Sequence, residues 1–256
     1  MKRVAIVTGA AKPESIGHEV AVRLQKEGMQ VVVLDLYEEG FKTLPGCRCI
    51  VTDVADFRAV ETALAALERI DVLVNCVGGS WEITPKDLRA GPRRGFLGLT
   101  NCSLEDWNTI RGANLDSVFY CCRAAAPLLK KQGGAIVNVE SVAARKGIPP
   151  GAEGSSGPYA VAKAGVMGLT RQLALELGGF GVRVNCVAPG VIASGRLKKV
   201  LAFSGEKGPE GPLKQIPMGR VGTVAETAAL IVALCSDDTS YMTGATVDIN
   251  GASYAA

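Results

Sequence analysis

Residues 3–18 read RVAIVTGAAKPESIGH, a short apolar run followed by a turn that contains Gly9. The uninterrupted run over 4–7 is typical of a strand that is buried on both faces of a parallel sheet. A helix is predicted from Ile16, and such a turn lets backbone N–H groups and the helix N-terminus approach a pyrophosphate. The turn lacks the full G-x-G-x-x-G spacing, so a purely structural turn is the alternative for this segment alone.

The same alternation of apolar runs and helical patterns continues to the end of the sequence. The candidate strands are 3–8, 30–35, 48–52, 71–75, 135–139, 182–187 and 246–249. Helical patterns lie near 16–28, 55–68, 104–131, 158–178 and 223–235. This order predicts an α/β protein with one doubly wound, parallel, seven-stranded sheet flanked by helices on both faces. No repeat or linker divides the chain, so residues 1–256 are expected to form a single domain.

Composition and charge exclude several classes of protein. The 256 residues are 48% hydrophobic and 21% charged, an ordinary globular balance. The net charge of +3 is too small to indicate nucleic-acid binding. No uncharged apolar run is long enough for a membrane span, and the first apolar run is too short for a secretion signal.

The cysteines do not predict a metal site. None of the eight forms a CxxC pair, and His18 is the only histidine, so four zinc ligands at recognisable spacing are missing. We expect no metal, and reduced, mostly buried thiols in a cytoplasmic protein.

Ligands of open parallel sheets bind outside the carboxyl ends of the strands, and Asp35 ends the second predicted strand. A carboxylate there can bond the adenosine ribose hydroxyls and repel a 2′-phosphate, which favours NAD over NADP. Lys12 in the glycine turn has the opposite effect, because a cation there could receive a phosphate. Since Asp35 is placed where the ribose should be, NAD is the predicted cofactor.

Further candidates follow the next two strands. Asp53 and Val54 come after the third strand, and Asp53 could contact the adenine amino group. Asn75 and Gly78 come after the fourth strand, where they could let the cofactor lie against the backbone. As isolated residues, all of these would be ordinary turn chemistry.

Tyr159 and Lys163 follow the fifth predicted strand, at the start of a helix. Residues four apart share a helix face, so the Lys163 ammonium can lie near the Tyr159 phenol. A free phenol has a pKa of about 10. A nearby cation favours the phenolate and brings this pKa closer to the pH at which a general acid–base works. A Tyr–Lys pair at this spacing also occurs by chance, so its position just after a strand end gives it weight.

In combination and order, these segments resemble the short-chain dehydrogenase/reductase family over almost the whole chain. The matching pieces are Thr8-Gly9…Ile16-Gly17, Asp53-Val54, Asn75-Cys76-Val77-Gly78, Asn114, Asn138-Val139-Glu140-Ser141, Tyr159…Lys163, Pro189-Gly190-Val191-Ile192-Ala193-Ser194, Tyr241-Met242-Thr243-Gly244 and Asp248…Gly251. The resemblance implies a Rossmann-type fold and an enzyme that moves a hydride between NAD and a secondary alcohol or ketone.

The resemblance also implies a role for each catalytic residue. Tyr159 would exchange a proton with the substrate oxygen, and Ser141 would hydrogen-bond that oxygen. Lys163 would bind the nicotinamide ribose and hold down the Tyr159 pKa. Asn114 would hold a water that links Lys163 to bulk solvent. Ile192 and Ser194 would meet the nicotinamide carboxamide. The cofactor-binding residues are then Gly9, Ser15, Ile16, Gly17, Asp35, Asp53, Val54, Asn75, Gly78, Tyr159, Lys163, Pro189, Gly190, Ile192 and Ser194.

The chain departs from the family pattern at several positions. The glycine turn is about two residues longer than usual, and Ser15 stands where a middle glycine is expected. Ser141 lies further from Tyr159 in sequence than usual, so Ser155 and Ser156 are rivals for its role. Cys76-Val77 replace the usual Asn-Ala, and Ser194 replaces a usual Thr.

Loop insertions near 79–101 and 147–157 are expected to flank the pocket, with a substrate lid near 195–217. Cations that could recognise an anionic group on a small-molecule substrate are Arg89, Arg93, Arg94, Arg196, Lys198 and Lys199. Solvated surface charge is the alternative for all six. Hydroxy acids, sugar alcohols, dihydrodiols and sterols are candidate substrates, with or without that group.

Helices 104–131 and 158–178 are expected, from the resemblance, to form a subunit interface in a homotetramer or homodimer. Neither a nucleic acid nor a membrane is an expected partner. Two other functions stay open. The longer glycine turn is similar to that of the enoyl reductase branch, but that branch spaces its Tyr and Lys more widely than Tyr159 and Lys163. A catalytically silent NAD-sensing protein need not keep an intact Ser/Tyr/Lys/Asn set.

Overall fold

Seven parallel strands form the central sheet of the computed structural model, which describes residues 2–79, 96–150, 152, 155–195 and 214–255. In chain order the strands are β1 (Val4–Thr8), β2 (Gln30–Asp35), β3 (Arg48–Val51), β4 (Val72–Asn75), β6 (Gly134–Val139), β8 (Val182–Pro189) and β9 (Thr246–Ile249). Their order in the sheet is β3-β2-β1-β4-β6-β8-β9. The predicted doubly wound α/β fold and its strands are confirmed.

The strand order reverses between β1 and β4. The chain moves from β1 outward to β2 and β3, and then returns to place β4 on the other side of β1. The crevice outside the carboxyl ends of strands at such a switch point is where ligands of doubly wound sheets bind. The segments that follow β1 and β4 are therefore the first places to search for a site.

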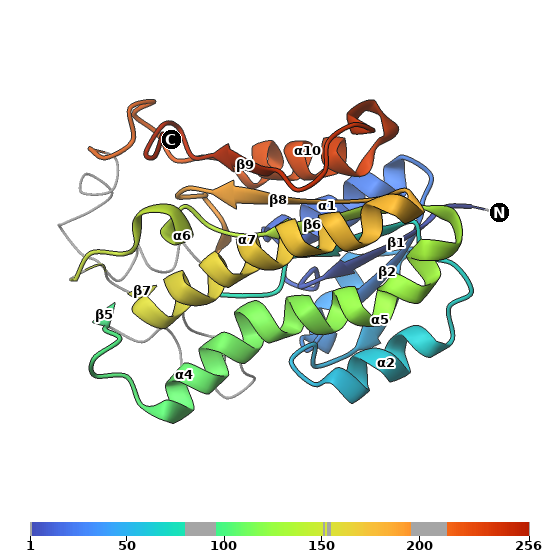
Figure 1. Ribbon diagram of the computed structural model, residues 1–256, viewed down its shortest axis with the longest axis horizontal. Helices are drawn as coiled ribbons and strands as arrows, with labels where there is room; N and C mark the ends of the chain where they lie inside the picture. The colour runs from blue at the N-terminus through green and yellow to red at the C-terminus, as the bar shows by residue number, and fades with distance from the viewer. Residues whose placement is uncertain (1, 80–95, 151, 153–154, 196–213, 256) are drawn as a thin grey trace.

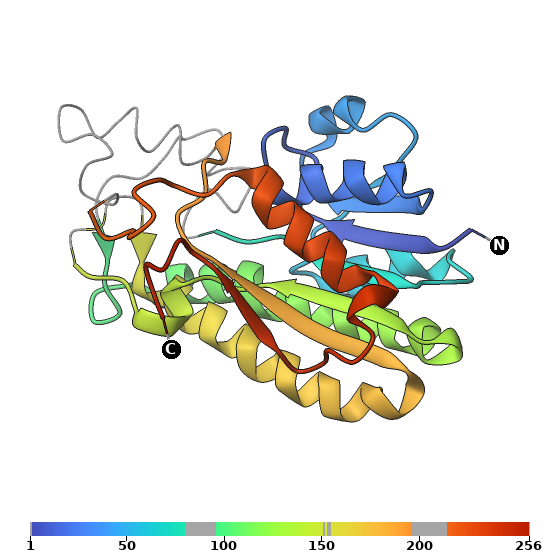
Figure 2. The same ribbon diagram turned by 90° about the horizontal axis from the view of Figure 1, so that it is seen from above.

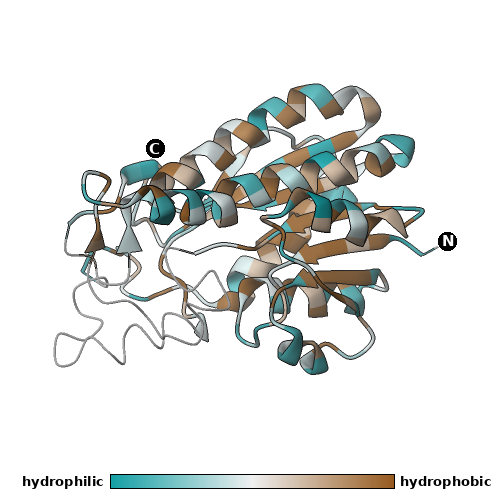
Figure 3. Cartoon of the chain, turned by 90° about the horizontal axis from the view of Figure 1, so that it is seen from below, coloured by the Kyte–Doolittle hydropathy of each residue, from teal (hydrophilic) through white to brown (hydrophobic). Residues whose placement is uncertain are grey.

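Helices lie on both faces of the sheet (Figures 1 and 2). Apolar side chains between these helices and the sheet form two cores. Within β1, Ile6 packs in one core, while Ala5 and Val7 pack in the other. One face is covered by α2 (Phe57–Ala65), α5 (Ser117–Gln132) and α7 (Gly157–Leu177). The other is covered by α1 (Ile16–Lys26) and α10 (Val224–Cys235). Burial on both faces explains why the strands read as continuous apolar runs, and Figure 3 shows these strands as mostly hydrophobic.

The helix predicted over 104–131 is interrupted. It consists of α4 (Leu104–Arg111), a π-helical turn (Gly112–Asp116) and α5. Within that turn, Asn114 Nδ2 donates to the carbonyl oxygen of Ile110 at 2.8 Å. In a regular helix this carbonyl accepts the backbone N–H four residues later, so the side chain competes with the ladder and favours the wider turn. Side-chain capture of a backbone carbonyl is not visible in hydrophobic periodicity.

The two predicted loop insertions are joined at their ends, which the sequence did not indicate. Strand β5 (Phe96–Leu97) pairs in parallel with β7 (Ser155–Ser156), immediately before α7 begins. A short helix, α6 (Ala143–Lys146), lies nearby (Figure 1). Within the described residues, 3₁₀ turns cover Glu38–Thr43, Gly178–Phe180 and Asp237–Thr239. The parallel pair therefore fixes the segment that leads into the helix carrying Tyr159 and Lys163.

Candidate active site

The glycine turn after β1 has no room for side chains at two positions. Gly9 has a φ of +70°, and a Cβ there would lie 2.9 Å from the backbone nitrogen of Val77. A Cβ on Gly17 would lie 2.5 Å from the carbonyl oxygen of Gly9. These glycines leave a bare backbone cradle at the N-terminus of α1, which fits the pyrophosphate of a dinucleotide.

Ser15 has a structural role in this cradle. It is the N-cap of α1, where its Oγ accepts a hydrogen bond from the backbone N–H of His18 at 3.1 Å. Ile16 is the first residue of the helix. The serine that stands in place of the expected glycine therefore ends the long turn by starting the helix.

Asp35 ties the end of β2 to the glycine turn. Its Oδ2 accepts a hydrogen bond from the backbone N–H of Ala11, and its Oδ1 accepts one from Tyr37, both at 2.9 Å. Each carboxylate oxygen has a second lone pair, so both can still accept from ribose hydroxyls. The structure places Asp35 beside the predicted pyrophosphate cradle, as the sequence predicts.

The residues that follow β3 and β4 separate into surface and interior groups. Asp53 is exposed, and its Oδ1 accepts from the backbone N–H of Ala55 at 2.9 Å, whereas Val54 is buried. The Asn75 side chain is directed into the protein, where its Nδ2 donates to Asn138 Oδ1 at 2.9 Å. Asn138 in turn donates to Thr170 Oγ1 at 2.9 Å. The Asn75 side chain thus links β4, β6 and α7, and only its backbone lies at the strand end.

Thr8 is a positioning residue to which the sequence interpretation gave no role. Its Oγ1 accepts from the backbone N–H groups of Cys76 and Val77 at 3.1 and 3.3 Å. This holds the segment after β4 against the end of β1. The available signal was its place directly before Gly9, where a hydroxyl can bond across to the neighbouring strand end.

Tyr159 and Lys163 lie together on the first turns of α7. The Lys163 Nζ is 5.8 Å from the centre of the Tyr159 ring. Lys163 is only 3% exposed, and it donates to the carbonyl oxygen of Val139 at 2.8 Å. Burial lowers the pKa of this ammonium to about 8, although nearby acidic groups raise it. The lysine is thus held at the end of β6, beneath the half-buried tyrosine.

Asn114 and Gly78 also lie near Lys163. Asn114 Oδ1 accepts from the backbone N–H of Gly79 at 2.8 Å, and its Nδ2 donates to the Gly79 carbonyl at 2.9 Å. A Cβ on Gly78 would collide with Asn114 Oδ1 and would lie 3.0 Å from Lys163 Nζ. The π-helical turn therefore places Asn114 near Gly78 and Lys163.

Ser141 lies at the same edge of the sheet, two residues beyond β6. It is half-buried, and its Oγ accepts from the backbone N–H of Ala143 at 3.2 Å, at the start of α6. Of its two rivals, Ser156 is fully buried as the N-cap of α7 and accepts from the backbone N–H of Tyr159 at 3.4 Å. Ser155 lies in β7, paired with Phe96. Both hydroxyls accept a backbone N–H, but Ser156 is fully buried whereas Ser141 is half-buried, and this difference in exposure favours Ser141 for contact with a ligand.

The segment after β8 completes the edge. Pro189 ends the strand, and a Cβ on Gly190 would lie 2.8 Å from the Cα of Asn250. Ile192 forms an isolated bridge to Gly222, and the backbone N–H of Ser194 donates to the Ile192 carbonyl at 2.7 Å. These contacts fix the backbone where the resemblance places the nicotinamide.

Glu140 lies between Val139 and Ser141 and is the functional candidate that sequence reasoning missed. Its side chain is 2% exposed, and its Oε2 accepts a hydrogen bond from Cys186 Sγ at 3.4 Å. Burial raises the pKa of this carboxyl, and Lys163 is among the charges that oppose the rise. The available signal was an acidic residue directly after a buried apolar strand.

Six cations predicted to recognise an anionic substrate lie outside the described residues: Arg89, Arg93, Arg94, Arg196, Lys198 and Lys199.

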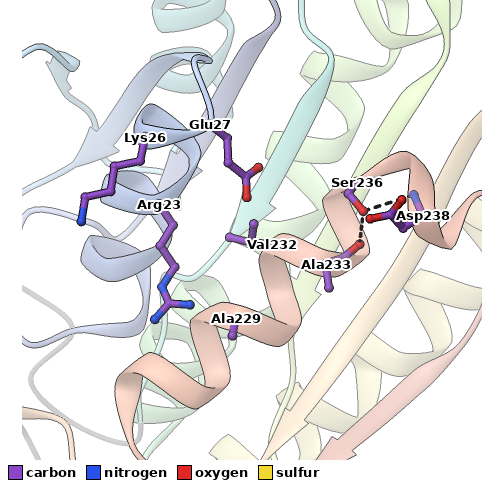
Figure 4. A pocket seen from close by; sticks show the side chains of 8 residues that line it. All are labelled: Arg23, Lys26, Glu27, Ala229, Val232, Ala233, Ser236 and Asp238. Carbon is purple, nitrogen blue, oxygen red and sulfur yellow. Dashed lines mark hydrogen bonds between the residues drawn. The ribbon is translucent and has the colours of Figure 1, made fainter.

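A surface groove between α1 and α10 contains none of the predicted site residues. Figure 4 shows its lining, which consists of Arg23, Lys26, Glu27, Ala229, Val232, Ala233, Ser236 and Asp238. These residues belong to the C-terminal part of α1, to α10 and to the 3₁₀ turn that follows α10. The glycine turn lies at the opposite end of α1, so this groove is separate from the candidate active site.

The following statements on metal sites, membrane-spanning helices and cysteines apply to the part of the chain that the structure describes. No three His, Cys, Asp or Glu side chains there come together as a metal site. No helix there has the length and apolar character to cross a membrane. All eight cysteines lie within the described ranges, and all are free.

Comparisons with known proteins cover nearly the whole chain. A family model described as "Enoyl-(Acyl carrier protein) reductase" matches residues 9–252. The short-chain reductase protein NovJ of Streptomyces niveus is 38% identical over 97% of this chain and 92% of its own. The 3-oxoacyl-[acyl-carrier-protein] reductase FabG of Thermotoga maritima is 36% identical over 97% and 96%. The Escherichia coli FabG is 33% identical over 98% and 97%.

A solved structure is also similar to this chain. The crystal structure titled ribose-5-phosphate isomerase from Brucella melitensis 16M superposes with a TM-score of 0.80 at 30% sequence identity. The match covers 98% of this chain and 92% of the other. The similarity therefore extends over the whole fold.

Proposed function

The chain belongs to the short-chain dehydrogenase/reductase family, and on this premise we propose that it transfers a hydride between NAD(H) and a secondary alcohol or ketone. The observation that carries the proposal is the pair formed by the half-buried Tyr159 and the buried Lys163, near Asn114. Lys163 is held at the end of β6, and the glycine cradle follows β1, with β4 between these two strands. A phenol next to an ammonium is suited to exchange a proton with a substrate oxygen.

Each residue has a separate task in this proposal. Tyr159 donates its phenolic proton to the carbonyl oxygen in reduction, and accepts it back in oxidation. Ser141 donates a hydrogen bond to the same oxygen. The Lys163 ammonium favours the phenolate and binds ribose hydroxyls, while Asn114 orders the path to solvent. When bound, the dinucleotide supplies or accepts the hydride, and the protein supplies orientation and proton transfer.

The names of the relatives indicate two types of substrate, which must be distinguished for this protein. FabG is named for a 3-oxoacyl substrate, whereas the family model is described as an enoyl reductase. The spacing of four between Tyr159 and Lys163 supports carbonyl chemistry, because the enoyl branch is expected to space this pair more widely. A catalytically silent NAD sensor is the alternative of a different class. That the substrate carries an anionic group stays a prediction.

The proposal is tested with a panel of secondary alcohols and their ketones, with and without an anionic group, monitored by NADH absorbance. A matched pair of 3-oxoacyl and enoyl thioesters is included. We expect turnover of at least one alcohol–ketone couple and none of the enoyl substrate. Turnover of the enoyl compound alone would show that the protein reduces C=C bonds and would contradict the proposal.

The cofactor is proposed to be NAD, with support from the placement of Asp35 beside the glycine turn. Replacing Asp35 by Asn is expected to raise the use of NADP relative to NAD by about tenfold or more, because it removes a like charge from the position of a 2′-phosphate. The ratio of kcat/KM for the two cofactors measures this effect. Asp53→Asn is the matched control, since Asp53 is exposed and bonds its own turn. A ratio that changes less than about twofold in Asp35→Asn would remove the basis for NAD.

The assignment of Ser141 over Ser156 is tested by comparing their alanine variants. Ser141→Ala is expected to lower kcat by about 10²-fold, because the substrate oxygen loses a hydrogen-bond donor. Ser156→Ala removes the N-cap of α7 and is expected to lower the free energy of unfolding by about 1 kcal/mol, with a smaller effect on kcat. Steady-state kinetics and urea unfolding measure the two effects. The opposite ranking of kcat would assign the substrate contact to Ser156.

The protein is further proposed to be a cytoplasmic homotetramer, or a homodimer, that acts as one domain on a small molecule. Free thiols at all eight cysteines support a reducing compartment. Exposed apolar side chains on α5 and α7, namely Phe119, Val161 and Leu175, support an interface on these helices. Light scattering of the purified protein gives the number of subunits.

A further inference from the structure

The interior between the sheet and α7 contains an acidic side chain, Glu140, that interacts electrostatically with the buried Lys163. Glu140 follows β6, and its backbone N–H donates to the carbonyl of Val187 in β8 at 2.8 Å. Its Oε2 accepts from Cys186 Sγ, and that sulfur also lies 3.0 Å from Thr246 Oγ1 in β9. Glu140 Oε1 is buried and has no hydrogen-bond partner among the described residues. Such a carboxyl is costly to bury unless a nearby cation balances it.

Lys163 is a buried cation that lacks a contacting anion among the described residues. Its ammonium has three N–H donors and is buried, and the acceptor that it reaches is the Val139 carbonyl. Within the described ranges it makes no ion pair at contact distance. A buried ammonium without a nearby anion loses its proton readily.

Among the described acidic side chains that act on Lys163, Glu140 is the one carboxyl. The others are the thiols of Cys76 and Cys186. Burial raises the pKa of both thiols to about 12, so they carry no charge at neutral pH. The electrostatic partner of the lysine is therefore the carboxyl one residue before Ser141.

We propose that Glu140 is a positioning residue whose carboxylate keeps the buried Lys163 ammonium charged, and through it tunes Tyr159. The charged and titratable groups facing Glu140 are Lys163 from α7, Arg145 from α6, Asp248 from β9 and Cys186 from β8. Arg145 is paired with Asp248 at 3.4 Å, which leaves Lys163 as the cation without a carboxylate of its own. The role in tuning Tyr159 rests on the proposed function, whereas the charge coupling does not.

The coupling is measured directly on Lys163, without substrate or cofactor. Isotope-labelled lysine is followed by NMR through a pH titration, with the Lys163 signal assigned from its loss in Lys163→Met. Glu140→Gln keeps the shape of the side chain and an acceptor for Cys186, but removes the charge. We expect the midpoint of the Lys163 titration to fall by about one pH unit, as for two charges several ångströms apart inside a protein.

Two variants control this measurement. Glu140→Asp keeps the charge and is expected to restore most of the midpoint. Asp248→Asn removes a nearby carboxylate that Arg145 already pairs, and is expected not to lower the midpoint. If Glu140→Gln does not fold, the wild-type protein with labelled glutamate still decides: coupled groups must each show a step at the midpoint of the other. An unchanged Lys163 midpoint in Glu140→Gln, or the absence of those reciprocal steps, overturns the proposal.

The effect on Tyr159 is read from the pH profile of ketone reduction. In Glu140→Gln the alkaline limb is expected to move to lower pH by about the same amount as the Lys163 midpoint. A merely structural residue would lower activity without moving the limb. If no carbonyl substrate is turned over at all, the proposed function fails while the Lys163 titration still reports on the coupling.

Discussion

Turnover of Tyr159→Phe is expected to be lower than that of the wild type by about 10²- to 10⁴-fold, the usual contribution of a positioned general acid–base. The substitution removes one oxygen atom and keeps the ring, which lies 5.8 Å from Lys163 Nζ. Because the glycine cradle and Asp35 are untouched, the dissociation constant for NADH should stay within about twofold. Single-turnover kinetics and fluorescence titration with NADH measure the two quantities.

Tyr241→Phe is the matched control, because Tyr241 lies near the C-terminus and is fully exposed. It should leave both quantities unchanged. Full activity in Tyr159→Phe would remove the tyrosine from the reaction, and the assignment to alcohol–ketone chemistry would lose its support. A sensing function, in contrast, should survive this substitution.

Replacing Lys163 by Met is expected to lower turnover by about 10²- to 10⁴-fold and also to weaken NADH binding, because the ammonium serves both Tyr159 and the ribose. This double effect separates the variant from Tyr159→Phe. The free energy of unfolding is also expected to fall, because removing the ammonium leaves the buried Glu140 carboxyl without its nearby cation. Thermal unfolding checks this point, and Lys131→Met on the exposed end of α5 is the control.

The pH dependence of the same pair follows from the direction of the lysine shift. Burial lowers the Lys163 pKa to about 8, so the ammonium is present below that pH and is lost as the pH rises through it. Ketone reduction needs both the Lys163 ammonium and the protonated phenol of Tyr159. The rate of reduction is therefore expected to fall above about pH 8, where the ammonium is lost. In Lys163→Met the residual rate should instead fall near pH 10, the ordinary pKa of a phenol. An alkaline limb that stays near pH 8 in this variant would contradict the assignment.

Local sequence patterns predicted the seven strands of the central sheet to within one residue at each end, except that β8 extends two residues further, to Pro189. The physical reason is that strands buried on both faces must be apolar throughout, and that signal depends on neighbouring residues alone. The spacing of four between Tyr159 and Lys163 is equally local, since helix geometry puts both on one face.

Side-chain competition with the backbone was not predictable in the same way. The π-helical turn depends on Asn114 reaching the Ile110 carbonyl and the Gly79 backbone, which lies far away in sequence. The pairing of β5 with β7 joins two segments that lie far apart in the sequence. Hydrophobic periodicity contains no information about such long-range partners.

The amino-acid sequence alone determined the order of strands and helices, the bare glycine turn and the distance between Tyr159 and Lys163. Only the tertiary structure decided that Lys163 and Glu140 are both buried and interact electrostatically. It also decided that the Asn75 side chain is directed inward and that Ser156 caps a helix. The first group follows from backbone geometry and from residues close in the chain. The second follows from which surfaces lose water when β6, β8 and α7 pack together, and that loss sets the ionisation of the catalytic groups.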